Sequence, residues 1–162
     1  MSRLVVISVV LLGLLFGGCG VYTFNPRGKS EIKSIAVERF GNQTAEYGLE
    51  DQVTDLVTDA LISDGTMQVV SSDLAEALLE GTLVGYDRKP YNYDENDRVT
   101  SYEVTMAFQV TLRNRADDTE LWTERISRQG IYLVDTETED IAQQKAIKLL
   151  VDDILNKTTK SW

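Results

Sequence analysis

The most regular segment of this chain reads Tyr102-Glu103-Val104-Thr105-Met106-Ala107-Phe108-Gln109-Val110-Thr111-Leu112-Arg113. Apolar and polar side chains alternate along it. Because successive side chains of a strand point to opposite faces, this alternation predicts a long β-strand with one buried face and one solvated face. The polar residues 116–119 that follow predict a tight turn. Residues 121–132 then return as a hairpin partner, whose register the sequence leaves open.

Upstream of this strand, the sequence pattern changes from strand to helix and back to strand. Residues 32–40 and 67–70 have strand-like composition, and residues 46–63 between them repeat apolar side chains at helical spacing. A strand, a helix and a strand in this order predict a right-handed parallel crossover. We expect another strand at 78–87, in which the glycines mark a bend or a close approach by another backbone. A polar loop is expected at 88–100.

Two amphipathic helices are expected, one in each half of the chain. The first, at 46–63, has an apolar stripe made of Leu49, Val53, Leu56, Val57, Ala60 and Leu61. The second, at 138–157, has a stripe made of Ile147, Leu150, Val151 and Ile154, with Ala146 and Leu149 beside it. Thr136 and Glu139 have the spacing of a capping box at its start. The simplest way to bury both stripes is an α+β fold (an α/β sandwich) in which two helices pack on one face of a small mixed, mostly antiparallel β-sheet.

The first part of the chain has the pattern of a secretory signal that ends at the only cysteine, Cys19. Arg3 precedes an apolar run at 4–16, which is too short to span a bilayer, and two glycines follow it. We therefore expect 1–18 to be a lipoprotein signal peptide, with diacylglyceryl and a further acyl chain such as palmitate attached at Cys19. Two or three acyl chains anchor a protein stably in a membrane. The alternative is an ordinary cleaved signal with an incidental cysteine.

The residue after the cysteine, Gly20, favours the outer membrane under the enterobacterial sorting rule. The prediction is thus a protein anchored by lipid on the periplasmic side of the outer membrane. Residues 19–31 would form a lipidated tether, and 32–162 a single domain.

The composition excludes several classes of function. The chain has no histidine, and its one cysteine is assigned to the lipid. This excludes catalytic sites that use a histidine or a cysteine thiol, and it excludes zinc sites with histidine or cysteine ligands. No glycine-rich phosphate loop is present. The net charge of −10 argues against nucleic acid as a partner. We expect no enzyme activity, no metal, and no cofactor beyond the covalent lipid.

The candidate contact residues for a partner or a lipid headgroup are the few basic side chains and two loop tyrosines. Guanidinium groups suit phosphates, and tyrosines often anchor protein partners. The alternatives are dispersed surface charge and tyrosines that fold back onto the sheet. Residues 94–97, three of which are acidic, lack the spacing of a calcium loop and indicate a solvated loop. The candidates are Arg88, Lys89, Tyr91, Tyr93 and Arg98 in the expected loop, and Arg113 and Arg115 near the hairpin turn at 116–119.

Taken in order, several strings resemble the LptE family of lipopolysaccharide-assembly lipoproteins. They span nearly the whole mature chain, and each is structural rather than diagnostic by itself. The strings are Cys19-Gly20-Val21-Tyr22 with Phe24, Ile35-Ala36-Val37-Glu38-Arg39-Phe40-Gly41-Asn42-Gln43-Thr44, Leu79-Glu80-Gly81-Thr82-Leu83-Val84-Gly85-Tyr86, the alternating strand to Leu112-Arg113-Asn114, Leu121-Trp122, and the helix at 146–155.

This resemblance implies an LptE-like α/β domain at 32–162 and a specific role. Members of the family are outer-membrane lipoproteins, not enzymes, that face the periplasm. They sit as a plug inside an outer-membrane β-barrel, LptD, and the two proteins together insert lipopolysaccharide into the outer leaflet. Lipopolysaccharide binding has been attributed to basic residues in some members. Within this role, the segment at 88–100 and the hairpin tip at 117–118 are expected to contact the barrel or the lipid.

A second interpretation belongs to a different class. The strand at 35–44 and the helix after it also resemble the start of curli-secretion and peptidoglycan-synthase-activator lipoproteins. The alternative function is therefore a periplasm-facing lipoprotein that acts as a secretion component or as a regulator of a peptidoglycan synthase. The long hairpin and terminal helix of the second half favour the LptE resemblance.

Overall fold

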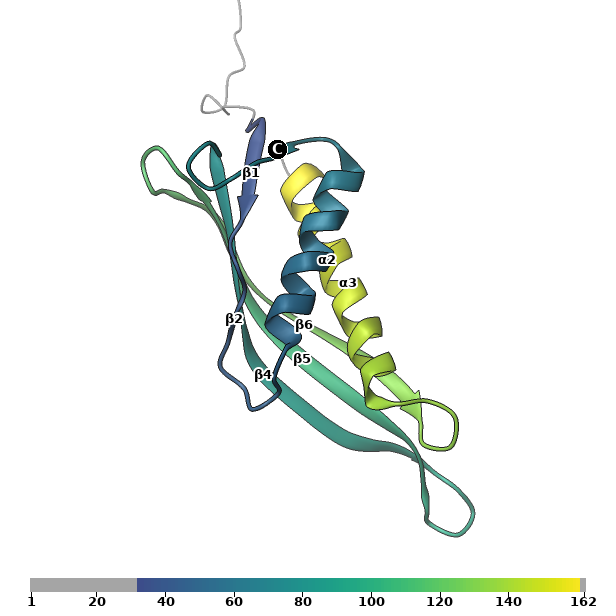
Figure 1. Cartoon of the computed structure of the whole chain (residues 1–162). Coiled ribbons are helices and arrows are strands. Elements are labelled where there is room, and N and C mark those ends of the chain that lie inside the picture. The colour runs from purple at the N-terminus through teal and green to yellow at the C-terminus, as the bar shows by residue number, and fades with distance from the viewer. Residues whose placement is uncertain (1–31, 161–162) are drawn as a thin grey trace, which may run out of the picture. The chain divides into compact units, whose positions relative to one another are not determined.

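A computed structural model describes residues 32–160. The predictions for the signal peptide, for Cys19 and for the tether at 19–31 lie outside the described residues. The chain forms two helices and a six-stranded sheet (Figure 1), so the predicted α+β fold is confirmed. The elements are β1 (Ser34–Val37), β2 (Gly41–Asn42), α2 (Leu49–Asp64), β3 (Gln68–Val69), β4 (Ala77–Tyr93), β5 (Val99–Asn114), β6 (Glu120–Leu133) and α3 (Glu139–Lys160).

The sheet is mixed, and its two halves are connected differently. The strand order is β3-β1-β4-β5-β6, and β2 also pairs with β4. β1 runs parallel to both β3 and β4, which confirms the parallel crossover through α2. β4, β5 and β6 are antiparallel and joined by two hairpins. The long antiparallel strands make up most of the sheet, and the short parallel strands join α2 to one edge of them.

β5 is the central long strand and confirms the alternation that the sequence predicts. Val104, Met106, Phe108, Val110 and Leu112 are at most 1% exposed, whereas the odd-numbered positions from 105 to 113 are half-buried. The register is now fixed, with β5 position 108 opposite position 126 of β6. The even-numbered face of β5 therefore forms the floor of the core.

Both helices cover this same face of the sheet, as Figure 1 shows. Positions 49, 53, 57 and 61 of α2 are buried, and so are positions 142, 146, 147, 150 and 154 of α3. One residue of the predicted stripes differs, because Leu56 is 39% exposed and lies beside the groove between the two helices. Leu149, which was expected beside the second stripe, is 46% exposed. No helix among residues 32–160 is long and apolar enough to cross a membrane.

The polar loop expected at 88–100 is wrong, because most of this segment is paired strand. β4 continues to Tyr93 and β5 begins at Val99, so only a short turn separates them. Pairing satisfies the backbone, while the side chains project beyond the helices into solvent and have no apolar face to bury. That is why their sequence resembles a loop. Pro90 is tolerated because the partners of β4 on its other side end at Leu83, which leaves an edge strand.

The first predicted strand is also shorter than expected, because the chain turns inward at Phe40. Its ring is 2% exposed and packs over Gly81. A Cβ atom on Gly81 would lie 2.0 Å from this ring, so the close approach at that glycine is made by a side chain rather than by another backbone as expected. The predicted break at 41–44 is wrong in part, since Gly41–Asn42 pairs with β4 as β2.

Candidate functional site

The hairpin between β4 and β5 holds five of the seven predicted contact residues. It projects past the ends of the helices (Figure 1) and closes with an ordered turn. The Asp94 carboxylate accepts hydrogen bonds from the backbone N–H groups of Asn96 and Arg98, at 2.8 and 2.9 Å. These donors hold the pKa of Asp94 below its usual value. The acidic run thus builds a turn, and no cluster suited to a metal ion occurs among the described residues.

The hairpin presents two tyrosines and one arginine to solvent. Tyr91 is 49% exposed and Tyr93 is 58% exposed, so neither folds back fully onto the sheet. The Arg98 guanidinium lies 2.8 Å from the Asp94 carboxylate and is exposed over most of its surface. Large amphipathic side chains on a rigid, exposed hairpin are suited to a protein partner.

Arg88 lies on the helix-facing side of β4 and is held by two groups. Its guanidinium carbon is 4.2 Å from the centre of the Tyr102 ring, which stacks on Tyr132 at 5.7 Å. Its Nη1 atom lies 3.3 Å from the Glu139 carboxylate. Desolvation by burial lowers the pKa of Arg88, but the neighbouring Tyr132, Glu139 and Tyr102 together raise it above its usual value. Arg88 therefore joins the hairpin to the start of α3.

Glu139 is also the acceptor of a second, partly buried network. The Tyr86 hydroxyl donates to its carboxylate at 2.5 Å, and the Gln143 amide donates to the Tyr86 oxygen at 2.9 Å. Burial, and then the bond to Glu139, raise the pKa of Tyr86 well above its usual value. The predicted capping box is wrong, because α3 begins at Glu139 itself and this side chain turns toward the sheet.

Lys89 points to the opposite face of the sheet from Arg88. Its ammonium lies 3.0 Å from the carboxylate of Glu103, which is only 6% exposed and also accepts a hydrogen bond from Gln129 at 3.0 Å. The pKa of Lys89 is raised by its hydrogen bond to Glu103 and by the charge of that group. Lys89 compensates a buried charge, which is a structural role.

The structure does not bring Arg113 and Arg115 to this hairpin. They lie at the other end of β5, next to the turn between β5 and β6. Arg113 pairs with Asp118 at 3.1 Å and with Glu80 at 3.6 Å. Arg115 is exposed and has no ion-pair partner among the described residues. The seven predicted contact residues therefore lie at two separate hairpins. Most of the cations among them already form an ion pair with a carboxylate.

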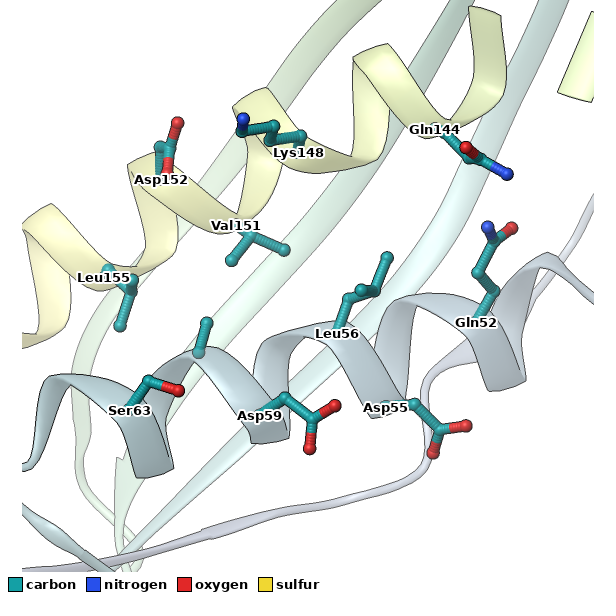
Figure 2. Close-up of a pocket in the computed structure, with 11 residues that line it drawn as sticks. Gln52, Asp55, Leu56, Asp59, Ser63, Gln144, Lys148, Val151, Asp152 and Leu155 are labelled. Carbon is teal, nitrogen blue, oxygen red and sulfur yellow. The ribbon is translucent and has the colours of Figure 1, made fainter. Parts of the chain in front are cut away.

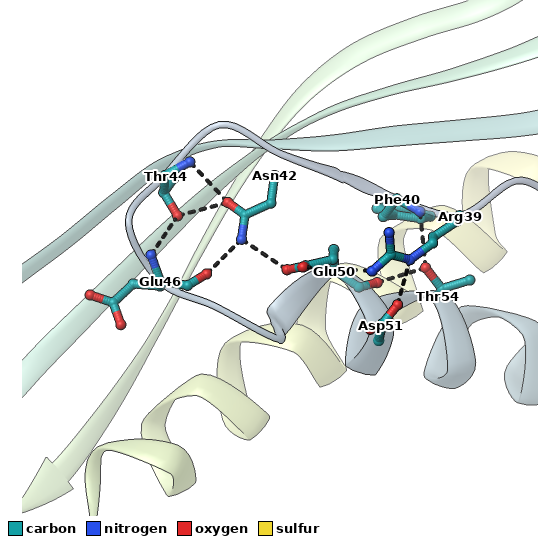
Figure 3. Close-up of polar contacts among 8 residues, drawn as sticks. All are labelled: Arg39, Phe40, Asn42, Thr44, Glu46, Glu50, Asp51 and Thr54. Carbon is teal, nitrogen blue, oxygen red and sulfur yellow. Dashed lines mark hydrogen bonds and ion pairs between the residues drawn. The ribbon is translucent and has the colours of Figure 1, made fainter.

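The string at 39–44 has a structural role, which Figure 3 shows. The Asn42 side-chain oxygen accepts hydrogen bonds from the backbone and hydroxyl of Thr44, at 2.9 and 2.8 Å. Its amide donates to the Glu46 carbonyl at 2.5 Å and to the Glu50 carboxylate at 2.9 Å. Asn42 thus joins β2 to the start of α2, whose N-terminus has no side-chain cap. Similarity to a family in this segment therefore indicates a shared fold more than a shared function.

Sequence reasoning missed the network of Tyr86, Glu139 and Gln143. Its members are 53 and 57 residues apart, so no spacing rule connects them. The signal in the sequence is Gly85, because a glycine inside a strand can mark a bulge. The structure has that bulge in β4 between Leu83 and Gly85, and it turns Tyr86 toward the helices.

A family model for lipopolysaccharide assembly, LptE, matches residues 32–158, which is nearly all of the described chain. The chain belongs to the LptE family. The resemblance that the sequence strings carry is therefore confirmed. The protein is a lipopolysaccharide-assembly lipoprotein of the cell envelope, as its family indicates.

Solved structures with the same fold support the architecture. Protein XCC0632 from Xanthomonas campestris is 10% identical, with a TM-score of 0.59 over 80% of this chain and 84% of that one. A lipoprotein B from Nitrosomonas europaea is 17% identical, with a TM-score of 0.51 over 84% and 90%. A minor lipoprotein from Acinetobacter baumannii is 12% identical, with a TM-score of 0.52 over 80% and 92%. At these identities the likeness shows the fold alone. No curated protein matches the sequence significantly.

Proposed function

We propose that this LptE-family protein forms a complex with an outer-membrane β-barrel of the LptD type, plugs its lumen, and assists the assembly of lipopolysaccharide at the cell surface. The observation that carries the proposal is the family match across 32–158. On this proposal the lipid on Cys19 anchors the domain on the periplasmic side of the outer membrane. Anchoring keeps the domain near its barrel at a high effective concentration.

The geometry of the β4–β5 hairpin supports a role in binding the barrel. The arms are paired from Asp87 to Tyr93, so the tyrosines at the tip are held by a rigid ladder. The cations of the hairpin are neutralised by Asp94, Glu103 and Glu139. A phosphate group would have to displace one of these carboxylates, whereas a polar protein wall could pair with both members of each ion pair. The proposed action is binding, with no catalytic step.

Depletion of the protein in living cells tests this function. We expect newly made lipopolysaccharide to accumulate on the periplasmic side, and the level of folded barrel in the outer membrane to fall. Normal lipopolysaccharide export after depletion, together with recovery of a peptidoglycan synthase on the tagged protein, would instead establish the regulator or secretion interpretation. A Cys19→Ala form directed to the periplasm by an ordinary signal serves as the control for the lipid anchor.

A further inference from the structure

Helices α2 and α3 lie side by side, run in the same direction, and leave a groove of about 720 Å³ between them. Figure 2 shows that Gln52 and Gln144 lie across from each other at one end, and that Ser63 and Leu155 lie at the other. Between them the groove follows α2 for about 16 Å, given the rise of 1.5 Å per residue, or about three turns of helix. Its length suits a short helical segment better than a small molecule.

The floor of the groove is apolar and continuous with the core. It is formed by Leu56 and Ala60 of α2 and by Val151 and Leu155 of α3. Val151 is 8% exposed, whereas Leu56 is 39% exposed although it belongs to the apolar stripe of its helix. Leu56 therefore has apolar surface that nothing in the described chain covers.

The rims of the groove are acidic, and their charges are uncompensated. Asp55 and Asp59 on α2 and Asp152 on α3 have no ion-pair partner among residues 32–160. The adjacent carboxylates that point away from the groove are both paired. Asp51 lies 2.6 Å from Arg39, and Asp153 lies 2.5 Å from Arg128. The chain thus neutralises the aspartates beside the groove but not those on its rims.

We propose that this groove binds an amphipathic helix of another protein, with an apolar stripe flanked by lysine or arginine. Residues at i, i+3 or i+4 and i+7 of that helix would fill the floor over Leu56 and Val151, as helix-in-groove recognition requires. Its flanking cations would meet Asp55, Asp59 and Asp152. A carboxylate on the bound helix opposite Lys148 would fix its position along the groove.

The charge of the rims favours a cationic helix over a second copy of this chain and over an anionic lipid. A second copy of the chain has a net charge of −10 and would bring further negative charge to the rims. The phosphates of lipopolysaccharide or of an anionic membrane would face three aspartates and one lysine. Both are repelled where a cationic helix is attracted, because complementary potentials determine which partner can approach.

The test measures binding of a fluorescein-labelled synthetic helix of about 18 residues. It carries a leucine and alanine stripe flanked by lysines, and a matched peptide carries glutamates in place of the lysines. The full lipidated chain is held in phosphatidylcholine nanodiscs, and empty nanodiscs give the background. We expect the lysine peptide to bind at least about tenfold more tightly than the glutamate peptide, and to weaken as salt rises.

Matched variants separate the groove from general attraction to an acidic protein. Asp55→Asn with Asp59→Asn should weaken binding of the lysine peptide by at least about tenfold, because both changes remove a negative charge. Both changes also keep the shape of the side chain. Asp64→Asn with Asp140→Asn removes the same charge from exposed sites outside the groove and should leave binding within about twofold. Equal loss in both double variants, equal binding of both peptides, or a dimer that forms through Leu56 in sedimentation experiments would each overturn the proposal.

Discussion

Replacing Gly130 with alanine tests how α3 is held on the sheet. Gly130 is a buried residue of β6, and a Cβ atom built there would lie 2.0 Å from the carbonyl oxygen of Ala142 in α3. The carbonyl carbon and the Cα of the same residue lie at 2.7 and 2.9 Å. These are backbone atoms, so no side-chain rotation relieves the overlap. The helix itself must move away from the strand by about 1 Å or more to restore normal contact distances.

The cost follows from what that movement disturbs. α3 also rests on the sheet through Ala146, Ile147 and Leu150, which are all fully buried. Overpacking a core costs about 1–3 kcal/mol. We expect Gly130→Ala to cost at least the upper value of this range, because backbone atoms cannot rotate aside as a side chain can. We therefore expect Gly130→Ala to lower the free energy of unfolding by about 3 kcal/mol. For a domain of this size that lowers the melting temperature by roughly 10 °C.

Urea unfolding in mild detergent, followed by circular dichroism, measures the effect. Gly85→Ala is the matched control, because its Cβ would meet only the Ala107 side chain at 3.5 Å, which is ordinary contact. Alanine in a strand is more stable than glycine by about 0.5–1 kcal/mol, because glycine loses more conformational freedom on folding. The Gly85→Ala control should therefore be neutral or slightly stabilising. Equal stability of the two variants would show that the contact between Gly130 and Ala142 does not hold α3 on the sheet.

Two further predictions concern polar groups of the hairpin and of β2. Asn42→Ala removes the hydrogen bonds that join β2 to α2, and we expect a loss of about 2 kcal/mol at neutral pH, measured by urea unfolding. The bond from Asn42 lowers the pKa of Glu50. The part of the stabilisation that comes from this one bond is therefore present above the usual carboxyl pKa and lost as pH falls through the lower pKa of the folded state. The difference from wild type should shrink below about pH 4, and an undiminished difference there would contradict the assignment. Lys89→Ala should lower the urea midpoint more than Arg98→Ala, since only Lys89 compensates the buried Glu103, and the reverse order would show that Lys89 is not structural.

The parts of the fold that bury apolar side chains were predictable from the sequence. The alternation from Val104 to Leu112 identifies β5 and its buried face, because only a half-buried strand selects that pattern. The buried positions of α2 and α3 follow from their apolar spacing in the same way. The hairpin beyond Tyr86 was not predictable, since its strands are stabilised by backbone pairing while its side chains face water.

The candidate site was predictable only as residue types. Arg88 and Lys89 are adjacent in the sequence, but the pleat sends them to opposite faces of the sheet and to different carboxylates. The partner of Arg88, Glu139, lies on a distant helix and had a local explanation as a cap. An ion pair between residues far apart in the sequence produces no periodic pattern. The pairs of Arg88 with Glu139 and of Lys89 with Glu103 could therefore not be inferred from the sequence.

We propose that this protein binds an outer-membrane barrel through its β4–β5 hairpin. Photocrosslinking in living cells from an amino acid placed at Tyr91 tests it most directly. The same group at Tyr47, which is 95% exposed in the segment between β2 and α2, serves as the control. We predict that position 91 captures a β-barrel protein of the LptD type, identified by mass spectrometry, and that position 47 captures it less. Capture of the barrel at neither position, with a peptidoglycan synthase recovered at position 91, would show that the hairpin does not bind the barrel.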